Sequence, residues 1–122
     1  MEQVVEKLKA AISGLQETST KEVMQKGVYL YLDAVNPLMR NKDSVVMQII
    51  IAEDSLSSAI SRINTIRDSI RQMENTFNGQ DIFKGLSAQE AGGMYVYAIV
   101  LEIEQYSDVL HGEVLHDEIF SN

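Results

Sequence analysis

The chain has 122 residues and contains no cysteine. This absence excludes a disulfide framework, thiolate zinc sites and cysteine nucleophiles, and it fits a reducing compartment. The longest uninterrupted apolar run, from Met94 to Leu101, covers eight residues, whereas a membrane-spanning helix needs about 20. The first residues are charged and lack the basic-then-apolar order of a secretory signal. We therefore expect a cytoplasmic protein with no membrane segment.

Lysine and arginine are absent from the 38 residues between Gly85 and the C-terminus, although the whole chain has ten of them. The same stretch holds seven acids, which account for most of the net charge of −8: Glu90, Glu102, Glu104, Asp108, Glu113, Asp117 and Glu118. Such asymmetry indicates the kind of partner rather than the fold. It favours a basic protein and disfavours nucleic acid and anionic membranes.

The length and the ordinary apolar share predict a single domain over residues 1–122. Apolar residues near the N-terminus recur at helical spacing up to Leu15. Ser19 and Glu22 have the spacing of a capping box, which predicts a second helix that ends or bends at Pro37.

A longer apolar seam follows the only proline. Its ten positions alternate steps of four and three residues: Val45, Ile49, Ala52, Leu56, Ala59, Ile63, Ile66, Ile70, Met73 and Phe77. This period of 3.5 is typical of a helix that packs lengthwise on another helix, as in a coiled coil. We expect one helix over 43–77, with the seam covered inside the chain. A homodimer through the same seam is the alternative.

A fourth helix is expected from Ser87 to about Phe120, because Ser87 and Glu90 repeat the capping signature. The run 94–101 has high β-propensity and is also compatible with a buried strand. Helical spacing continues beyond the run, from Val96 to Val114, and favours the helix. The predicted fold is thus all-α, an up-and-down antiparallel bundle of four main helices with the third and fourth long.

The residue pattern offers little for catalysis or for metal binding. His111 and His116 are five residues apart, so on a helix they point about 140° away from each other. Two histidines that bind zinc from one helix are spaced three or four residues apart. The long third segment lacks the Glu-x-x-Glu pairs that hold magnesium in all-helical nucleotide hydrolases. No Gly-x-Ser-x-Gly elbow and no phosphate-binding loop are present. We expect no enzyme activity, no cofactor and no metal.

The expected function is non-catalytic binding of a basic protein through an acidic C-terminal helix, as in a chaperone, an immunity protein or an inhibitor. Tyrosines near the acids add apolar area and a hydroxyl, which suits an interface. The candidate partner-binding residues are Glu102, Glu104, Asp108, His111, Glu118, Tyr95, Tyr97 and Tyr106. The alternative is a small-ligand protein or enzyme with an inter-helix pocket. That pocket would use Tyr29, Tyr31, Tyr97 and His111.

Leu86-Ser87, followed by Gly92-Gly93-Met94-Tyr95-Val96-Tyr97, is similar to a stretch found in some bacterial flagellin-export chaperones. The similarity covers about a dozen residues, and the usual N-terminal segment of that family is not evident. In outline, too, the chain resembles those acidic helical bundles. The resemblance implies a helical fold and a chaperone-like role toward an export substrate.

Overall fold

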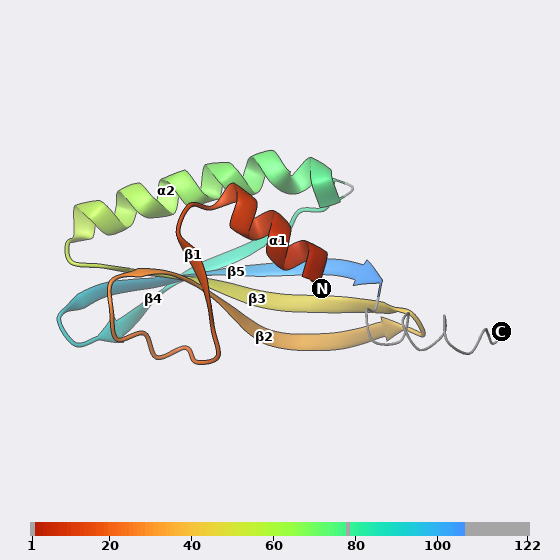
Figure 1. Cartoon of the computed structure of the whole chain (residues 1–122), viewed down its shortest axis with the longest axis horizontal. Helices are drawn as coiled ribbons and strands as arrows, with labels where there is room; N and C mark the ends of the chain where they lie inside the picture. Colours follow the sequence, from red (N-terminus) through yellow and green to blue (C-terminus); the bar gives the residue numbers. More distant parts are fainter. Residues whose placement is uncertain (1, 78, 107–122) are drawn as a thin grey trace.

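Five strands and two helices make up most of the protein in the computed structural model, which describes residues 2–77 and 79–106 (Figure 1). The elements follow in the order α1 (Glu2–Ala11), β1 (Leu15–Thr18), β2 (Gly27–Met39), β3 (Lys42–Glu53), α2 (Leu56–Met73), the short 3-10 helix η1 (Glu74–Phe77), β4 (Phe83–Ala91) and β5 (Met94–Tyr106). The predicted all-α four-helix bundle is therefore wrong, and so is the predicted coiled coil.

The strands form one mixed sheet in the order β1-β2-β3-β5-β4. β1 runs parallel to β2, and the other neighbouring pairs are antiparallel. Both helices lie on the same face of this sheet (Figure 1). We call this the helix face and the other the open face.

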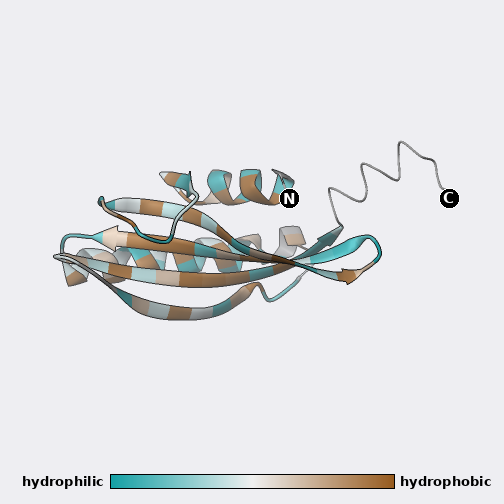
Figure 2. Ribbon diagram, turned by 90° about the horizontal axis from the view of Figure 1, so that it is seen from below, coloured by the Kyte–Doolittle hydropathy of each residue, from teal (hydrophilic) through white to brown (hydrophobic). Residues whose placement is uncertain are grey.

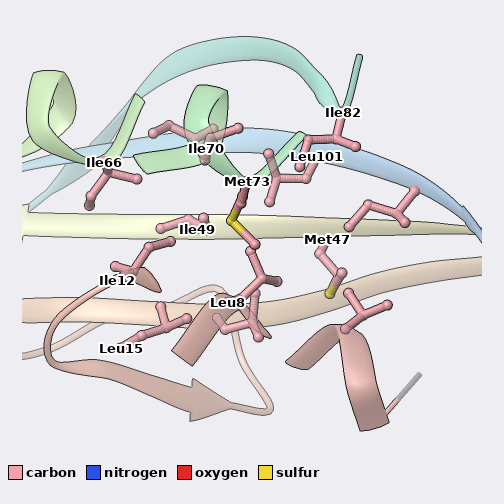
Figure 3. Packing of buried hydrophobic residues seen from close by; sticks show 14 of the residues in the cluster. Leu8, Ile12, Leu15, Met47, Ile49, Ile66, Ile70, Met73, Ile82 and Leu101 are labelled. Atoms are coloured by element: carbon pink, nitrogen blue, oxygen red, sulfur yellow. The ribbon is translucent and has the colours of Figure 1, made fainter. Parts of the chain in front are cut away.

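The main core lies between the helices and the sheet. Leu8 of α1, Ile12 just after that helix and Leu15 of β1 pack against Met47 and Ile49 of β3 (Figure 3). α2 contributes a buried stripe at spacings of four and three residues: Ala59, Ile63, Ile66, Ile70 and Met73. Helical periodicity in this segment therefore reflects packing against a sheet rather than against another helix.

A smaller cluster lies on the open face, toward the start of β2. Val23, from the segment between β1 and β2, packs there with Ile50, Ala52, Val96 and Ala98. Figure 2 views the molecule from the side opposite the helices and shows apolar and polar bands alternating along the strands. The segment around Val23 thus covers only part of the open face.

The helices expected over 19–37 and 43–77 are not formed as predicted. Residues 27–39 are β2, and the capping signal at Ser19 and Glu22 precedes no helix. The first three seam positions, Val45, Ile49 and Ala52, lie in β3, and a helix begins only at Leu56. Every seam residue except Leu56 is buried in the core of this one chain.

The predicted fourth helix is also wrong over its described part. Residues 83–91 and 94–106 are the antiparallel strands β4 and β5, joined by Gly92 and Gly93. Ser87 and Glu90 lie within β4 and cap no helix. The remainder of that predicted helix, 107–120, is outside the described residues. Neither helix in the described ranges is long and apolar enough to cross a membrane.

Candidate protein-binding edge of the sheet

β1 covers only the first part of the outer edge of β2. The four residues of β1 pair with Val28, Tyr29, Leu30 and Tyr31. After Thr18 the chain leaves the edge of the sheet and crosses to the open face, where Val23 is buried. Within 2–77 and 79–106, no strand pairs with β2 on that side between Leu32 and Met39. This eight-residue stretch, which we call the free β2 edge, presents unpaired main-chain donors and acceptors.

Four large apolar side chains on the free β2 edge are exposed. The exposed fractions are 45% for Leu32, 39% for Val35, 49% for Leu38 and 63% for Met39. Leu32 is paired with Met47 and Val35 with Val45, and both partners are buried in the main core. Because cross-strand partners share a face, the apolar surface of the helix face continues outward to this edge.

The distal part of the β2–β3 hairpin extends past the N-terminal end of α1 (Figure 1). The helices therefore do not cover the sheet at this end. Met39 pairs with Lys42, so Arg40 and Asn41 form the two-residue loop of the hairpin. The exposed side chains of the free β2 edge are thus held on a long hairpin that is closed by a tight turn.

Two irregularities shape the free β2 edge. The register with β3 shifts between Leu32 and Ala34 and again between Pro37 and Met39. Bulges and an edge proline hinder indiscriminate pairing with other strands, including a copy of the same strand. An irregular edge accepts only a segment that matches its shape, which favours a specific partner over self-association.

The opposite edge of the sheet offers a comparison. β4 is hydrogen-bonded to β5 on one side only in the described sheet, and among its side chains Leu86 is the exposed large apolar one. Its central residues, Ser87, Ala88 and Gln89, are small or polar. The free β2 edge is therefore the more apolar of the two long open edges.

The strand conformation brings three of the predicted partner-binding residues together. Glu102, Glu104 and Tyr106 are two residues apart along β5, so their side chains lie on one face, the open face. Glu102 Oε2 accepts a hydrogen bond of 2.5 Å from Ser44 Oγ. Lys42 Nζ lies 3.3 Å from Glu104 Oε1. Both acids are exposed, but each already has a partner on β3.

Tyr95 and Tyr97 do not belong to that group. Their odd positions in β5 place them on the helix face, where Tyr97 packs against the main core and Tyr95 is 44% exposed. The predicted single surface of acids and tyrosines is therefore divided between two faces. Asp108, His111 and Glu118 lie outside the described residues.

The tyrosines proposed for an inter-helix pocket are likewise separated. Tyr29 and Tyr31 pack against the open-face cluster, and the Tyr29 hydroxyl donates to the Gln25 carbonyl at 3.0 Å. Tyr97 is on the other face, and His111 is outside the described residues. In the part of the chain that the structure describes, no three acids or histidines gather where they could hold a metal ion.

Sequence reasoning missed the free β2 edge. The available signals were the β-branched and aromatic residues from Val28 to Leu32 and the proline at position 37, which is tolerated in an edge strand. Comparison of the chain with models of protein families and with curated protein sequences finds no match. The site is therefore defined by its geometry alone.

Proposed function

We propose that the protein is a non-catalytic binding protein that holds an extended segment of a basic partner protein along the free β2 edge. The observation that carries the proposal is the main chain between Leu32 and Met39, which no strand of the described residues pairs on its outer side and which carries exposed apolar side chains. An added strand gains main-chain hydrogen bonds from such an edge, and side-chain pockets select its sequence.

The basic character of the partner is argued from charge. The chain has a net charge of −8. Glu102 and Glu104 stand in the same cross-strand rows as Ala34 and Asn36 of the free β2 edge. These acids are two strands in from the apolar edge, and their charge favours a segment that alternates apolar residues with lysine or arginine. The same charge disfavours binding to nucleic acid. We place the protein in the cytoplasm, because the absence of cysteine fits a reducing compartment.

Selection from a phage-displayed library of random linear peptides tests this proposal. We expect enrichment of peptides that alternate apolar and basic residues. The double substitution Leu32→Lys with Val35→Lys should weaken their binding by about tenfold or more, because it charges the apolar contact. Leu86→Lys on β4 is the matched control, since Leu86 is similarly exposed on the other edge.

The outcomes separate the alternatives. Loss of binding in the double variant and retention in Leu86→Lys support the free β2 edge. Equal binding by both variants, with unchanged circular dichroism, contradicts it. Binding lost only in Leu86→Lys would move the site to β4.

A further inference from the structure

A polar cleft opens between the C-terminal end of α1 and the exposed side of α2, away from the free β2 edge. Its volume is about 670 Å³, which is within the range of small-molecule sites. Ile12 and Ile66 contribute apolar surface, and Lys26, Glu53 and Arg62 contribute charge. Glu53 is six positions along β3 from Met47, the partner of Leu32, so the cleft lies roughly 20 Å along the strand from the near end of the free β2 edge.

Glu53 is the last residue of β3, and its side chain is only 3% exposed. Its carboxylate is attracted by two cations: Lys26 Nζ lies 3.7 Å from Oε1, and Arg62 Nη2 lies 3.2 Å from Oε2. The Arg62 contact lacks the alignment of a hydrogen bond, so Oε2 is a buried acceptor with no hydrogen-bond donor among the described residues. The carboxylate is thus held by the charges of Arg62 and Lys26 while part of its hydrogen-bonding capacity stays unused, so it can accept from a further donor.

Hydroxyl groups line the wall of the cleft that α2 provides. They recur along one side of the helix: Ser57, Ser58, Ser61, Thr65 and Ser69. Thr65 and Ser69 donate to the carbonyls of Ser61 and Thr65, so their remaining lone pairs can accept. The hydroxyls of Ser57 and Ser61 form no hydrogen bond within the described ranges, so each can donate one hydrogen bond and accept others.

The charges of the cleft restrict its ligand. Lys26 also lies 3.6 Å from Asp54, so the two cations face two carboxylates and the local charge is balanced. A balanced site lacks the excess positive charge that a nucleotide or another polyanion requires. None of the described residues that line the cleft is aromatic, so they offer no stacking surface for a flat ring.

We propose that this cleft binds a small zwitterion, a molecule with an ammonium and a carboxylate group, as in a free amino acid or a short peptide. The ammonium donates to the Glu53 carboxylate, and the ligand carboxylate is held by Arg62 and Lys26. Both cations are accessible for this, because their side chains are 40% and 55% exposed. The hydroxyls of α2 accept or donate to the remaining polar atoms. This site is independent of the proposed peptide binding at the free β2 edge.

Nuclear magnetic resonance titration of the full chain tests the proposal. The probes are the 20 common L-amino acids and the dipeptide Gly-Gly, each added singly, with ethylamine and acetate as single-charge comparators. We expect at least one zwitterion to shift amide signals of residues that line the cleft. Its dissociation constant should be at least about tenfold below those of ethylamine and acetate, because each of these engages only half of the site. Preference for Gly-Gly over the free amino acids would identify the ligand as a peptide, and the reverse preference as an amino acid.

Two substitutions complete the test. Arg62→Gln should weaken binding of the best zwitterion by about tenfold or more, and Glu53→Gln should do the same. Arg71→Gln is the matched control, because Arg71 lies on the same helix and, within residues 2–77 and 79–106, forms its ion pair with exposed Asp68. Arg62→Gln keeps the test decisive if Glu53→Gln fails to fold, since Arg62 is partly exposed. Absence of signal shifts with every zwitterion, or equal binding by the Arg62→Gln and Arg71→Gln variants, would overturn the proposal.

Discussion

At the scale of single residues, one glutamine replaces a piece of strand. β4 begins pairing with β5 at Phe83. Just before β4, the Ile82 carbonyl accepts a hydrogen bond of 3.0 Å from the Glu102 amide. Gln80 then continues the ladder with its side chain. Its Oε1 accepts from the Glu104 amide at 2.9 Å, and its Nε2 donates to the Glu104 carbonyl at 3.0 Å. A single side chain thus satisfies both main-chain groups of Glu104.

We predict that Gln80→Ala lowers the free energy of unfolding by about 1–2 kcal/mol, because two hydrogen bonds are lost at a partly exposed position. The amide of Glu104 should also exchange with solvent faster. Chemical denaturation and hydrogen exchange measure the two effects. Gln72→Ala on α2 is the control, since Gln72 is exposed, and it should change stability by less than about 0.5 kcal/mol. Unchanged protection of Glu104 would contradict the assigned contact.

At the scale of elements, the strands explain why periodicity misled the prediction. The segment from Val45 to Ala52 is apolar at every position but Gln48, because β3 is the central strand and is buried on both faces. In a run that is apolar almost throughout, positions chosen at any spacing are apolar. The alternating steps of four and three residues therefore do not distinguish a helix from a strand here. In α2 the same spacing was informative, since exposed polar residues separate the buried positions.

The candidate site depends on contacts between segments that are distant in the sequence. Whether Leu32 and Val35 are buried depends on how far β1 extends beside β2, and that length is set by the departure of the chain toward Val23. Nothing local to β2 encodes this. The acids Glu102 and Glu104 were found from composition, but their common face results from a strand period of two rather than from a helical stripe.

The turn between β4 and β5 gives a prediction at this scale. Ala91 pairs with Met94, so the loop consists of Gly92 and Gly93. Gly93 has a φ of 79°, in the left-handed region, whereas Gly92 does not have a positive φ. A Cβ added at either position would meet no atom within 4 Å, so only backbone strain distinguishes them.

We therefore expect Gly93→Ala to lower the free energy of unfolding by about 1 kcal/mol, the cost of a left-handed alanine. Gly92→Ala should leave stability unchanged or raise it by up to about 1 kcal/mol, because it restricts the unfolded chain. Thermal and denaturant unfolding of the two variants side by side measure the difference. Equal stabilities would show that the turn does not need a positive φ at Gly93.

At the scale of the whole molecule, the two proposed sites lie at different parts of the β2–β3 hairpin and differ in charge. The cleft at Glu53 is electrically balanced, whereas the free β2 edge belongs to a protein with a net charge of −8. Long-range attraction should therefore affect capture of a basic segment and leave zwitterion binding almost unchanged. This difference allows each site to be tested while the other serves as an internal reference.

The last prediction uses ionic strength. For a basic peptide selected on the free β2 edge, the association rate constant should fall by about tenfold or more between 20 and 500 mM NaCl, because salt screens the attraction that steers the encounter. The dissociation rate constant should change much less, since main-chain hydrogen bonds and apolar contacts hold the bound segment. Stopped-flow fluorescence with a labelled peptide separates the two constants. A peptide with its basic residues replaced by glutamine is the control, and it should associate at a rate nearly independent of salt.

Joint substitution of Glu102→Gln and Glu104→Gln should reduce the low-salt association rate and leave dissociation unchanged. An association rate that ignores both salt and these substitutions would remove charge from the recognition mechanism and leave the apolar edge as its only basis.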